Sequence, residues 1–241
     1  MIFYLHGLGC SKEFFIPLLS SLEPEKAYCA FDIMGFGETI VTDRLHGSEL
    51  YSFKNVALLL AELMDQLAVQ SCKLVLHSMT SAILPYLTNA QTQMIDRIVL
   101  LDPSLEFSLE EWSSQIVSMT DEKFFLYVDK LKAKAMSTFN YMTSSRYDIK
   151  INQFGENALM KMDKSALRLY SQQLYTLTRD ELIILAVQSL AEKINIYVST
   201  DRKKQVCLAV SPKTSCVFLK NASHFLMLDL PDDLKKLICS D

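Results

Sequence analysis

The stretch Lys73-Leu-Val-Leu-His-Ser-Met-Thr-Ser-Ala82 is the part of the sequence that indicates the fold most directly. Apolar residues lead into His77-Ser78-Met79 and small residues follow, so the pattern predicts a buried strand that turns sharply into a helix. Such a turn lifts a serine Oγ away from the edge of a sheet, and the helix behind it offers backbone N–H groups that have no partner within the helix. The stretch therefore identifies Ser78 as a candidate nucleophile.

Short apolar runs and helical patterns alternate on both sides of this stretch. Glu13 to Leu22 and Ser52 to Val69 carry apolar residues at helical spacing. The other predicted strands are Ile2–Leu5, Tyr28–Asp32, Arg97–Asp102, Ile194–Ser199 and Cys216–Lys220. This alternation is typical of an α/β fold in which helices cover both faces of a mostly parallel sheet, here of about six strands.

The alternation stops after the fourth predicted strand. From Pro103 to about Leu190 the sequence carries helix signals alone, including the capping-box patterns Ser108–Glu111 and Thr178–Glu181. We therefore expect a core made of residues 1–102 and 191–241, with a helical cap of residues 103–190 inserted into it.

The expected cap is dense in Phe, Tyr and Met between Phe124 and Met142. Most of these side chains are expected to pack against one another. Flexible thioethers also suit an adaptable apolar pocket, so we predict that an apolar acyl group of the substrate meets the cap.

Composition narrows the class of protein. The 241 residues are 50% hydrophobic and 22% charged, which favours a large core and argues against disorder. A net charge of −4 without a basic stripe argues against a nucleic-acid partner. The six cysteines form no C-x-x-C pair, so no metal is expected. The N-terminus lacks the basic region of a signal peptide, and no apolar run could span a bilayer. We therefore expect a soluble, cytoplasmic protein without a membrane partner. The sequence leaves the oligomeric state open.

His224 and one of two aspartates are candidates to act with Ser78. A serine hydroxyl needs a neighbouring base, and that base needs a third group to orient it. His224 follows the last predicted strand, Asp201 follows the fifth and Asp102 ends the fourth. At the carboxyl ends of parallel strands such residues converge on one crevice.

We expect Asp201 rather than Asp102 to orient the histidine. Asp102 precedes Pro103, which restricts it to an extended or turn conformation, and a structural role at the start of the cap is enough to explain it. Asp201 lies in a polar stretch, as expected for an exposed loop at the end of a strand. The alternative for Asp201 is a surface turn paired with Arg202 or Lys203.

Three loops complete the pattern. His6-Gly7-Leu8-Gly9 and Asp32-Ile-Met-Gly-Phe-Gly37 each follow a predicted strand, and Asn221–Pro231 contains His224. With Ser78, and with the chain order Ser–Asp–His, they resemble the oxyanion loop, the D-x-x-G-x-G loop, the histidine loop and the nucleophile elbow of the α/β-hydrolase family. The resemblance covers essentially the whole chain, although the first two strands that the family usually has are missing.

This resemblance implies a serine hydrolase that cleaves a carboxylic ester or thioester. Ser78 would attack the carbonyl carbon, His224 would take the proton, and Asp201 would hold the imidazole tautomer. The backbone N–H groups of Leu8 and Met79 would bind the oxyanion. No metal or organic cofactor is implied. The layout is similar to small carboxylesterases of the pimeloyl-carrier-protein methyl ester esterase type, so the substrate would be a small-molecule ester or a carrier-bound acyl group.

The residues beside Ser78 depart from the family pattern. The elbow of the family reads G-x-S-x-G, and Leu76 and Thr80 stand at its two glycine positions. These larger side chains imply either a slightly open elbow or smaller neighbours, such as Ser81 and Ala82. Two alternatives therefore stay open: a C–C bond hydrolase or lyase of the same fold, and a non-catalytic binding protein that has kept the fold without the reaction.

Overall fold

The computed structural model describes residues 1–20, 27–39, 50–106, 111–143, 147–199 and 212–239. Its centre is a six-stranded sheet with the order β2-β1-β3-β4-β5-β6, in which all neighbouring strands are parallel. The strands are β1 (Ile2–Leu5), β2 (Tyr28–Phe31), β3 (Cys72–His77), β4 (Ile95–Leu101), β5 (Ile194–Ser199) and β6 (Ser215–Leu219). The predicted α/β fold with a mostly parallel sheet of about six strands is confirmed.

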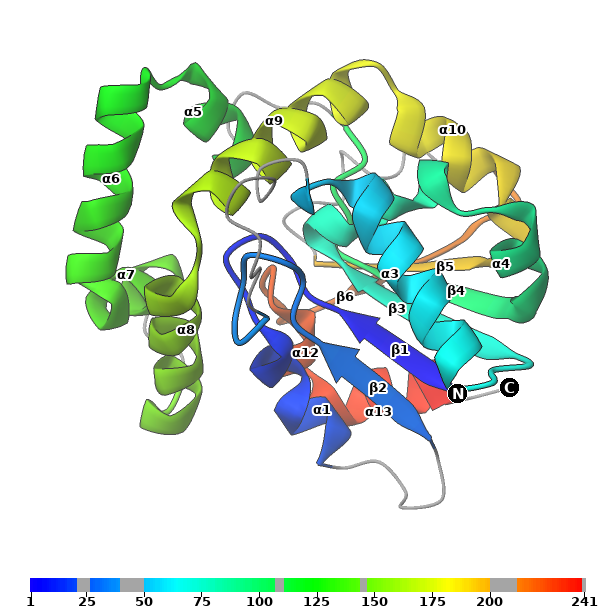
Figure 1. The fold of residues 1–241 in the computed structure, drawn as a ribbon. Helices are drawn as coiled ribbons and strands as arrows, with labels where there is room; N and C mark the ends of the chain where they lie inside the picture. Colours follow the sequence, from blue (N-terminus) through cyan, green and yellow to red (C-terminus); the bar gives the residue numbers. More distant parts are fainter. Residues whose placement is uncertain (21–26, 40–49, 107–110, 144–146, 200–211, 240–241) are drawn as a thin grey trace.

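Helices cover both faces of the sheet (Figure 1). One layer consists of η1 (Lys12–Phe15), α1 (Ile16–Leu19), α12 (Leu226–Asp229) and α13 (Pro231–Cys239). The other includes α3 (Phe53–Gln66), η2 (Ser78–Tyr86) and α4 (Asn89–Met94). The Ser52 hydroxyl caps α3 by accepting the Asn55 N–H at 3.1 Å, as its position before the apolar stripe predicts.

The parallel strands end at one edge of the sheet. The register pairs Leu5 of β1 with Leu76 of β3, and Leu76 with Leu100 of β4, so these three strands end at nearly the same level. His6, Ser78 and Asp102 follow them within one or two residues. Polar residues far apart in the sequence therefore meet at this edge.

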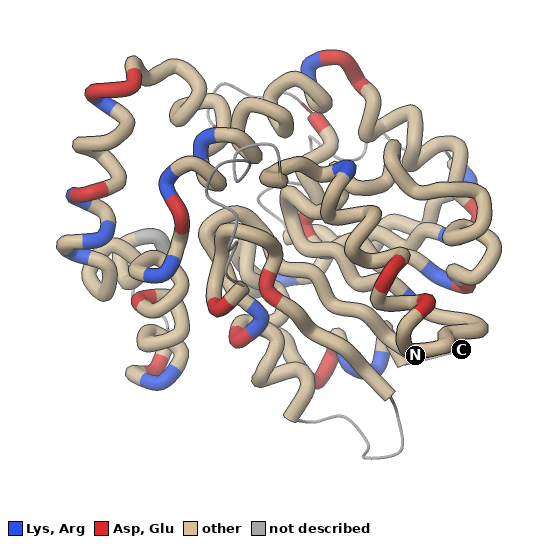
Figure 2. The backbone as a smooth tube through the Cα atoms, in the orientation of Figure 1, with Lys and Arg blue, Asp and Glu red and all other residues tan. Residues whose placement is uncertain are grey.

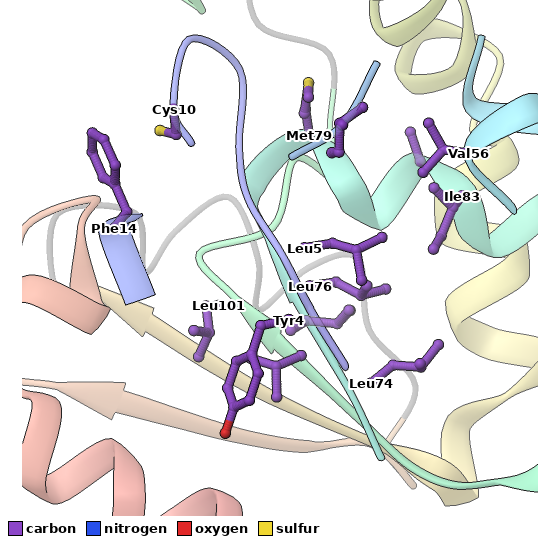
Figure 3. Packing of buried hydrophobic residues seen from close by; sticks show 14 of the residues in the cluster. Tyr4, Leu5, Cys10, Phe14, Val56, Leu74, Leu76, Met79, Ile83 and Leu101 are labelled. Carbon is purple, nitrogen blue, oxygen red and sulfur yellow. The ribbon is translucent and has the colours of Figure 1, made fainter. Parts of the chain in front are cut away.

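Apolar side chains fill the layer between β3 and α3. Successive side chains of a strand point to opposite faces, so Leu74 and Leu76 face the same layer. Figure 3 shows them with Leu5 of β1, Val56 of α3 and Ile83 of η2. All five are at most 1% exposed. Full burial of one such side chain stabilises the fold by about 1.5–3 kcal/mol.

Between β4 and β5 the described residues form helices and no strand. These are α5 (Trp112–Ser118), α6 (Asp121–Ala133), α7 (Ala135–Met142), α8 (Ile149–Lys161), α9 (Lys164–Arg179), α10 (Leu182–Ser189) and η3 (Ala191–Lys193). The last long one, α10, packs against η2 and so covers the sheet, whereas α6, α7 and α8 lie away from it (Figure 1). None of the described helices has the length and apolar character needed to cross a bilayer.

The sequence of α6 matches the dipole of a helix. Thr120 caps its first turn with the side-chain oxygen, and Asp121 and Glu122 follow at once. Lys130 and Lys132 occupy the last turn, and Figure 2 shows charged residues of both signs along the helix. Both placements stabilise the helix, because its N-terminus is partially positive and its C-terminus partially negative.

The predicted capping box at Thr178–Glu181 is wrong. α9 continues to Arg179, and the Thr178 hydroxyl donates back to the Leu174 carbonyl oxygen at 2.8 Å. Glu181 precedes α10 with a φ of +57° and makes no side-chain cap. A threonine within a formed helix bonds to the preceding turn, so its hydroxyl is not available to cap the next helix. The other predicted box, at Ser108, begins outside the described residues.

Gly155 allows α7 and α8 to pack closely. A Cβ at Gly155 would lie 2.2 Å from the ring of Phe139, which is only 3% exposed. Since the nearest atoms belong to the ring and not to the end of a flexible side chain, a Cβ at this position requires α7 and α8 to shift apart.

Gly155→Ala is therefore expected to lower the free energy of unfolding by about 1–3 kcal/mol, because it overpacks this contact. Helix propensity alone favours alanine over glycine by about 1 kcal/mol, so the sign of the effect separates the two causes. Asn157→Ala, at an exposed position of α8, is the matched control. Urea denaturation measures the free energy of unfolding of both variants and of the wild type. Equal or higher stability of Gly155→Ala would show that the close contact does not limit this position.

Candidate active site

Ser78 occupies a strained turn between β3 and η2. Its φ of +54° lies in the left-handed region, which is uncommon for a residue with a side chain. Two hydrogen bonds hold its carbonyl oxygen: the Ser81 hydroxyl donates at 2.8 Å and the Ser104 N–H at 3.3 Å. Strain that is held in place by its surroundings is typical of functional sites.

The Ser78 hydroxyl is the first member of a chain of hydrogen bonds. Its Oγ lies 3.0 Å from Nε2 of His224, and Nδ1 of the same ring lies 2.8 Å from Oδ2 of Asp102. Because a carboxylate only accepts, Nδ1–H donates to Asp102 and Nε2 accepts the Ser78 proton. Asp102 is completely buried, whereas 37% of the His224 side chain is exposed. The imidazole thus connects a buried carboxylate to the serine.

Asp102 is held by β5 as well as by its own strand. Its N–H donates to the Tyr197 carbonyl oxygen at 2.8 Å. Its Oδ1 accepts the Ser199 N–H at 2.9 Å and lies 3.2 Å from the Ser199 hydroxyl. The Ser199 hydroxyl lies equally 3.2 Å from Oδ2, the oxygen that faces His224, so Ser199 and His224 together hold both carboxylate oxygens.

Asp201, the carboxylate that we expected at His224, lies outside the described residues. The carboxylate that the structure places there is Asp102, the alternative that sequence reasoning ranked second. Pro103 does restrict Asp102, but Asp102 adopts a φ of +45°, which aspartate tolerates better than most residues. In that conformation its carboxylate reaches the histidine.

The loop His6–Gly9 lies directly against the serine. A Cβ at Gly7 would come within 3.0 Å of the Ser78 Cβ and within 2.7 Å of Nδ1 of His77, so only glycine fits there. Leu8 follows Gly7 in this loop, and Met79 follows Ser78 at the start of η2. Their backbone N–H groups remain the predicted donors to an oxyanion.

Family comparison agrees with this geometry. Residues 1–190 match the alpha/beta hydrolase fold family. The chain belongs to this family. None of the curated proteins shows a significant sequence match.

Solved structures of other α/β-hydrolases share the fold at low sequence identity. A hydrolase from Oleispira antarctica is 14% identical with a TM-score of 0.71, over 100% of this chain and 91% of that one. An esterase from Exiguobacterium antarcticum is 14% identical with a TM-score of 0.69, over 98% and 89%. A bromoperoxidase from Bacillus anthracis is 15% identical with a TM-score of 0.71, over 98% and 89%. At these identities the likeness shows the fold and not the reaction.

This α/β-hydrolase accommodates the two larger elbow residues without losing the sharp turn. Leu76 points into the core and is 0% exposed. Thr80 is also fully buried, and its hydroxyl lies 3.1 Å from the carbonyl oxygen of Leu5 and 2.9 Å from that of His77. The hydroxyl thus has partners in the protein, so its burial leaves no polar group unsatisfied.

The segment after Ser78 differs from the α-helix that the sequence favours. η2 is a 3₁₀ helix over all nine of its residues, longer than the usual three or four. Pro85 lacks the N–H that an α-helix would direct at the Ser81 carbonyl oxygen. The Thr80 and Ser81 hydroxyls also reach carbonyl oxygens three residues back. These side chains favour the tighter winding.

Two buried histidines tie the loops of the site together. Nε2–H of His77 donates to the His224 carbonyl oxygen at 2.9 Å, and burial, with His224 nearby, lowers the pKa of His77 to about 3. Nε2 of His6 accepts the Ile33 N–H at 3.0 Å, and its Nδ1 lies 2.9 Å from the Gly7 carbonyl oxygen. Burial lowers the pKa of His6 as well. Both rings are therefore neutral at pH 7.

Helix α5 reaches the site through Trp112, a residue that sequence reasoning did not single out. A Cβ at Gly9 would lie 2.9 Å from the Trp112 ring, so the start of α5 lies on the His6–Gly9 loop. The indole N–H of Trp112 donates to the Tyr127 hydroxyl at 2.8 Å, which fixes the ring. Trp112 is the only tryptophan of the chain, and that was its sole signal in the sequence.

Three carboxylates near the site are held by a lysine. Glu13, Asp32 and Glu38 lie close enough together to suggest a cation site. The Lys12 ammonium already lies 2.6 Å from Asp32, 3.0 Å from Glu38 and 3.6 Å from Glu13. Burial alone would raise the pKa of Asp32, but hydrogen bonds from Lys12 and the Glu38 N–H outweigh it and lower that pKa. The cluster is an ion-pair network that braces the loop after β2.

The buried histidines predict a loss of stability in acid. Unfolded histidine has a pKa near 6.5, and the folded-state pKa values of His6 and His77 lie below it. Below about pH 6.5 the unfolded chain therefore binds protons that the folded chain does not. The free energy of unfolding is unaffected above that pH. It should fall toward pH 3 by up to about 1.4 kcal/mol per pH unit because of His77, and His6 should add to this loss.

Urea denaturation between pH 7.5 and 4.5 measures this slope. His77→Gln keeps a side-chain N–H donor but cannot gain a proton in this range. Its stability should fall less steeply with acid than that of the wild type. Parallel curves for the two proteins would show that His77 does not contribute to the acid sensitivity.

Proposed function

We propose that this chain is a serine hydrolase that cleaves a carboxylic ester or thioester through an acyl-enzyme on Ser78. One observation carries the proposal: the unbroken chain of hydrogen bonds from Ser78 through His224 to the buried Asp102. A hydroxyl whose proton faces an imidazole nitrogen, itself oriented by a carboxylate, is the arrangement that activates serine for acyl transfer.

The mechanism needs two acyl transfers. Ser78 Oγ attacks the carbonyl carbon while His224 Nε2 takes the hydroxyl proton. His224 then returns this proton to the leaving alcohol or thiol as the carbonyl re-forms. Water adds to the acyl-enzyme by the same steps, so the acid leaves and Ser78 regains its proton. Asp102 stabilises the imidazolium in both halves, and the N–H groups of Leu8 and Met79 would stabilise the oxyanion, each by about 3–4 kcal/mol.

The strained serine argues against the non-catalytic alternative. A positive φ at a residue with a side chain costs about 1–3 kcal/mol. A scaffold without a reaction gains nothing from this cost, yet Ser78 keeps the φ of +54° and the contact with His224. No contact among the described residues specifically favours a C–C bond hydrolase or lyase. The structurally similar proteins include esterases, an epoxide hydrolase and a bromoperoxidase, so they do not indicate one reaction. Ester cleavage is therefore inferred from Ser78 and its hydrogen-bond partners.

Aromatic rings beside His224 support an apolar acyl group. Phe225, the next residue, packs against Phe14 with ring centroids 5.6 Å apart and against Phe139 of α7 at 5.9 Å. Core and cap therefore form one apolar cluster next to the base. We infer that the acyl chain, from a small ester or a carrier-bound substrate, lies along this cluster.

The protein should hydrolyse p-nitrophenyl esters, with a higher kcat/KM for hexanoate than for acetate, because each buried CH₂ contributes about 0.8 kcal/mol. Ser78→Ala should lose about a thousandfold or more of kcat while its melting temperature is retained. Spectrophotometric assays of wild type and variant over the acyl series measure both effects. Comparable turnover by Ser78→Ala would exclude Ser78 as nucleophile, and equal kcat/KM for the two esters would exclude the apolar acyl site.

Asp102→Asn should lower kcat by about 10²–10⁴-fold near neutral pH, because an amide at this position favours the wrong imidazole tautomer. Asp201→Asn is the matched comparison and should retain at least half of wild-type kcat. Steady-state kinetics of the two variants at equal purity decide between them. If the loss follows Asp201 instead, His224 is oriented by the loop after β5 and the assignment of Asp102 is wrong.

A further inference from the structure

A second carboxylate, Asp229 of α12, connects the histidine loop to the cap. Its Oδ2 accepts the Ser223 N–H at 2.6 Å and the Ser223 hydroxyl at 2.7 Å. Its Oδ1 accepts the hydroxyl of Tyr147 at 2.7 Å, and Tyr147 lies two residues before α8 in the cap. One oxygen of the carboxylate therefore binds the residue before His224, and the other binds the cap.

The same bonds fix the backbone on both sides of His224. The Ser223 hydroxyl, which donates to Asp229, also accepts the Phe225 N–H at 3.2 Å. The carbonyl group of His224 itself is held by His77. The position of the imidazole thus depends on a loop whose N-terminal side is anchored by Asp229.

Apolar contacts reinforce the connection. The Tyr147 ring stacks on Phe139 with centroids 6.4 Å apart and planes inclined by 24°. Phe139 in turn packs against Phe225. The cap therefore contacts the residues on both sides of His224, through a hydroxyl at Ser223 and through a ring at Phe225. The Tyr147 hydroxyl also lies 3.3 Å from the Ser223 hydroxyl.

We propose that Tyr147 and Asp229 are positioning residues for His224, so that docking of the cap aligns the base with Ser78. Hydrogen bonds to a carboxylate are about twice as strong as neutral ones, so Asp229 is suited to fix the loop. A shift of about 1 Å in a reacting group can cost roughly a hundredfold in rate. The proposal rests on the proposed hydrolase function, because it assigns His224 the role of base.

Tyr147→Phe removes the hydroxyl and keeps the ring that stacks on Phe139. Its kcat for p-nitrophenyl hexanoate should fall by about 5- to 50-fold, with KM within about twofold of wild type, because the base and not the substrate is displaced. Tyr141→Phe is the matched control: it removes a hydroxyl from α7 at a residue that is 87% exposed. It should leave kcat unchanged.

Asp229→Asn tests the same connection from the core. The amide cannot accept all three bonds, so kcat should fall at least as far as in Tyr147→Phe. If the two residues act through one connection, the double variant should fall no further than Asp229→Asn alone. Additive losses, or a kcat of Tyr147→Phe equal to that of Tyr141→Phe, would overturn the positioning role.

Amide hydrogen exchange of residues 219–230, followed by mass spectrometry, gives a readout that needs no activity. Exchange in this segment should be faster in Tyr147→Phe than in wild type and unchanged in Tyr141→Phe, because Ser223 and Phe225 lose support. Unchanged exchange in Tyr147→Phe would overturn the connection even in an active enzyme. If the wild type hydrolyses no ester, the proposed function fails, and faster exchange in Tyr147→Phe still supports the connection between cap and histidine loop.

Discussion

The parallel pairing of β1, β3 and β4 is the constraint on which the candidate site depends. Because Leu5, Leu76 and Leu100 lie side by side in the ladder, the three strands end together and their next residues share one edge. Parallel pairing also places β5 beside β4, where Tyr197 and Ser199 supply the hydrogen bonds that fix Asp102. The carboxylate is thus anchored by the sheet, whereas His224 is anchored by a loop.

That difference explains where the remaining polar contacts are found. Loops lack the ladder of backbone hydrogen bonds, so their backbone groups must find side-chain partners. His6 accepts the Ile33 N–H in the loop after β2, and His77 donates to the carbonyl oxygen of His224. Asp229 accepts the N–H of Ser223, the residue before His224. Two of these contacts need one protonation state: a protonated His6 could not accept the Ile33 N–H, and a protonated Asp229 could not accept as many bonds. The geometry of the base therefore depends on groups that do not touch the reacting atoms.

The sheet, Ser78 and His224 could be predicted from the sequence because their signals are local. An apolar strand before a small-residue turn, and the order of the loops, are visible within short windows. The choice between Asp102 and Asp201 could not be made from a short window of sequence. It depends on which strand lies beside β3, and reasoning from Pro103 about local conformation pointed away from Asp102. The role of Tyr147 could not be predicted either, because its partner Asp229 is far away in the sequence. At Thr178 the local capping pattern was misleading, because α9 continues past this residue to Arg179.

The central claim is that the hydroxyl of Ser78 is a nucleophile activated by His224. A fluorophosphonate probe tests it most directly, because such a probe forms a covalent adduct only with an activated serine. Intact mass spectrometry of the treated protein should show one adduct, and digestion should place it on the peptide that contains Ser78. The account predicts no adduct in His224→Ala under the same conditions. Absence of labelling in the wild type, or an adduct on another residue, would contradict it.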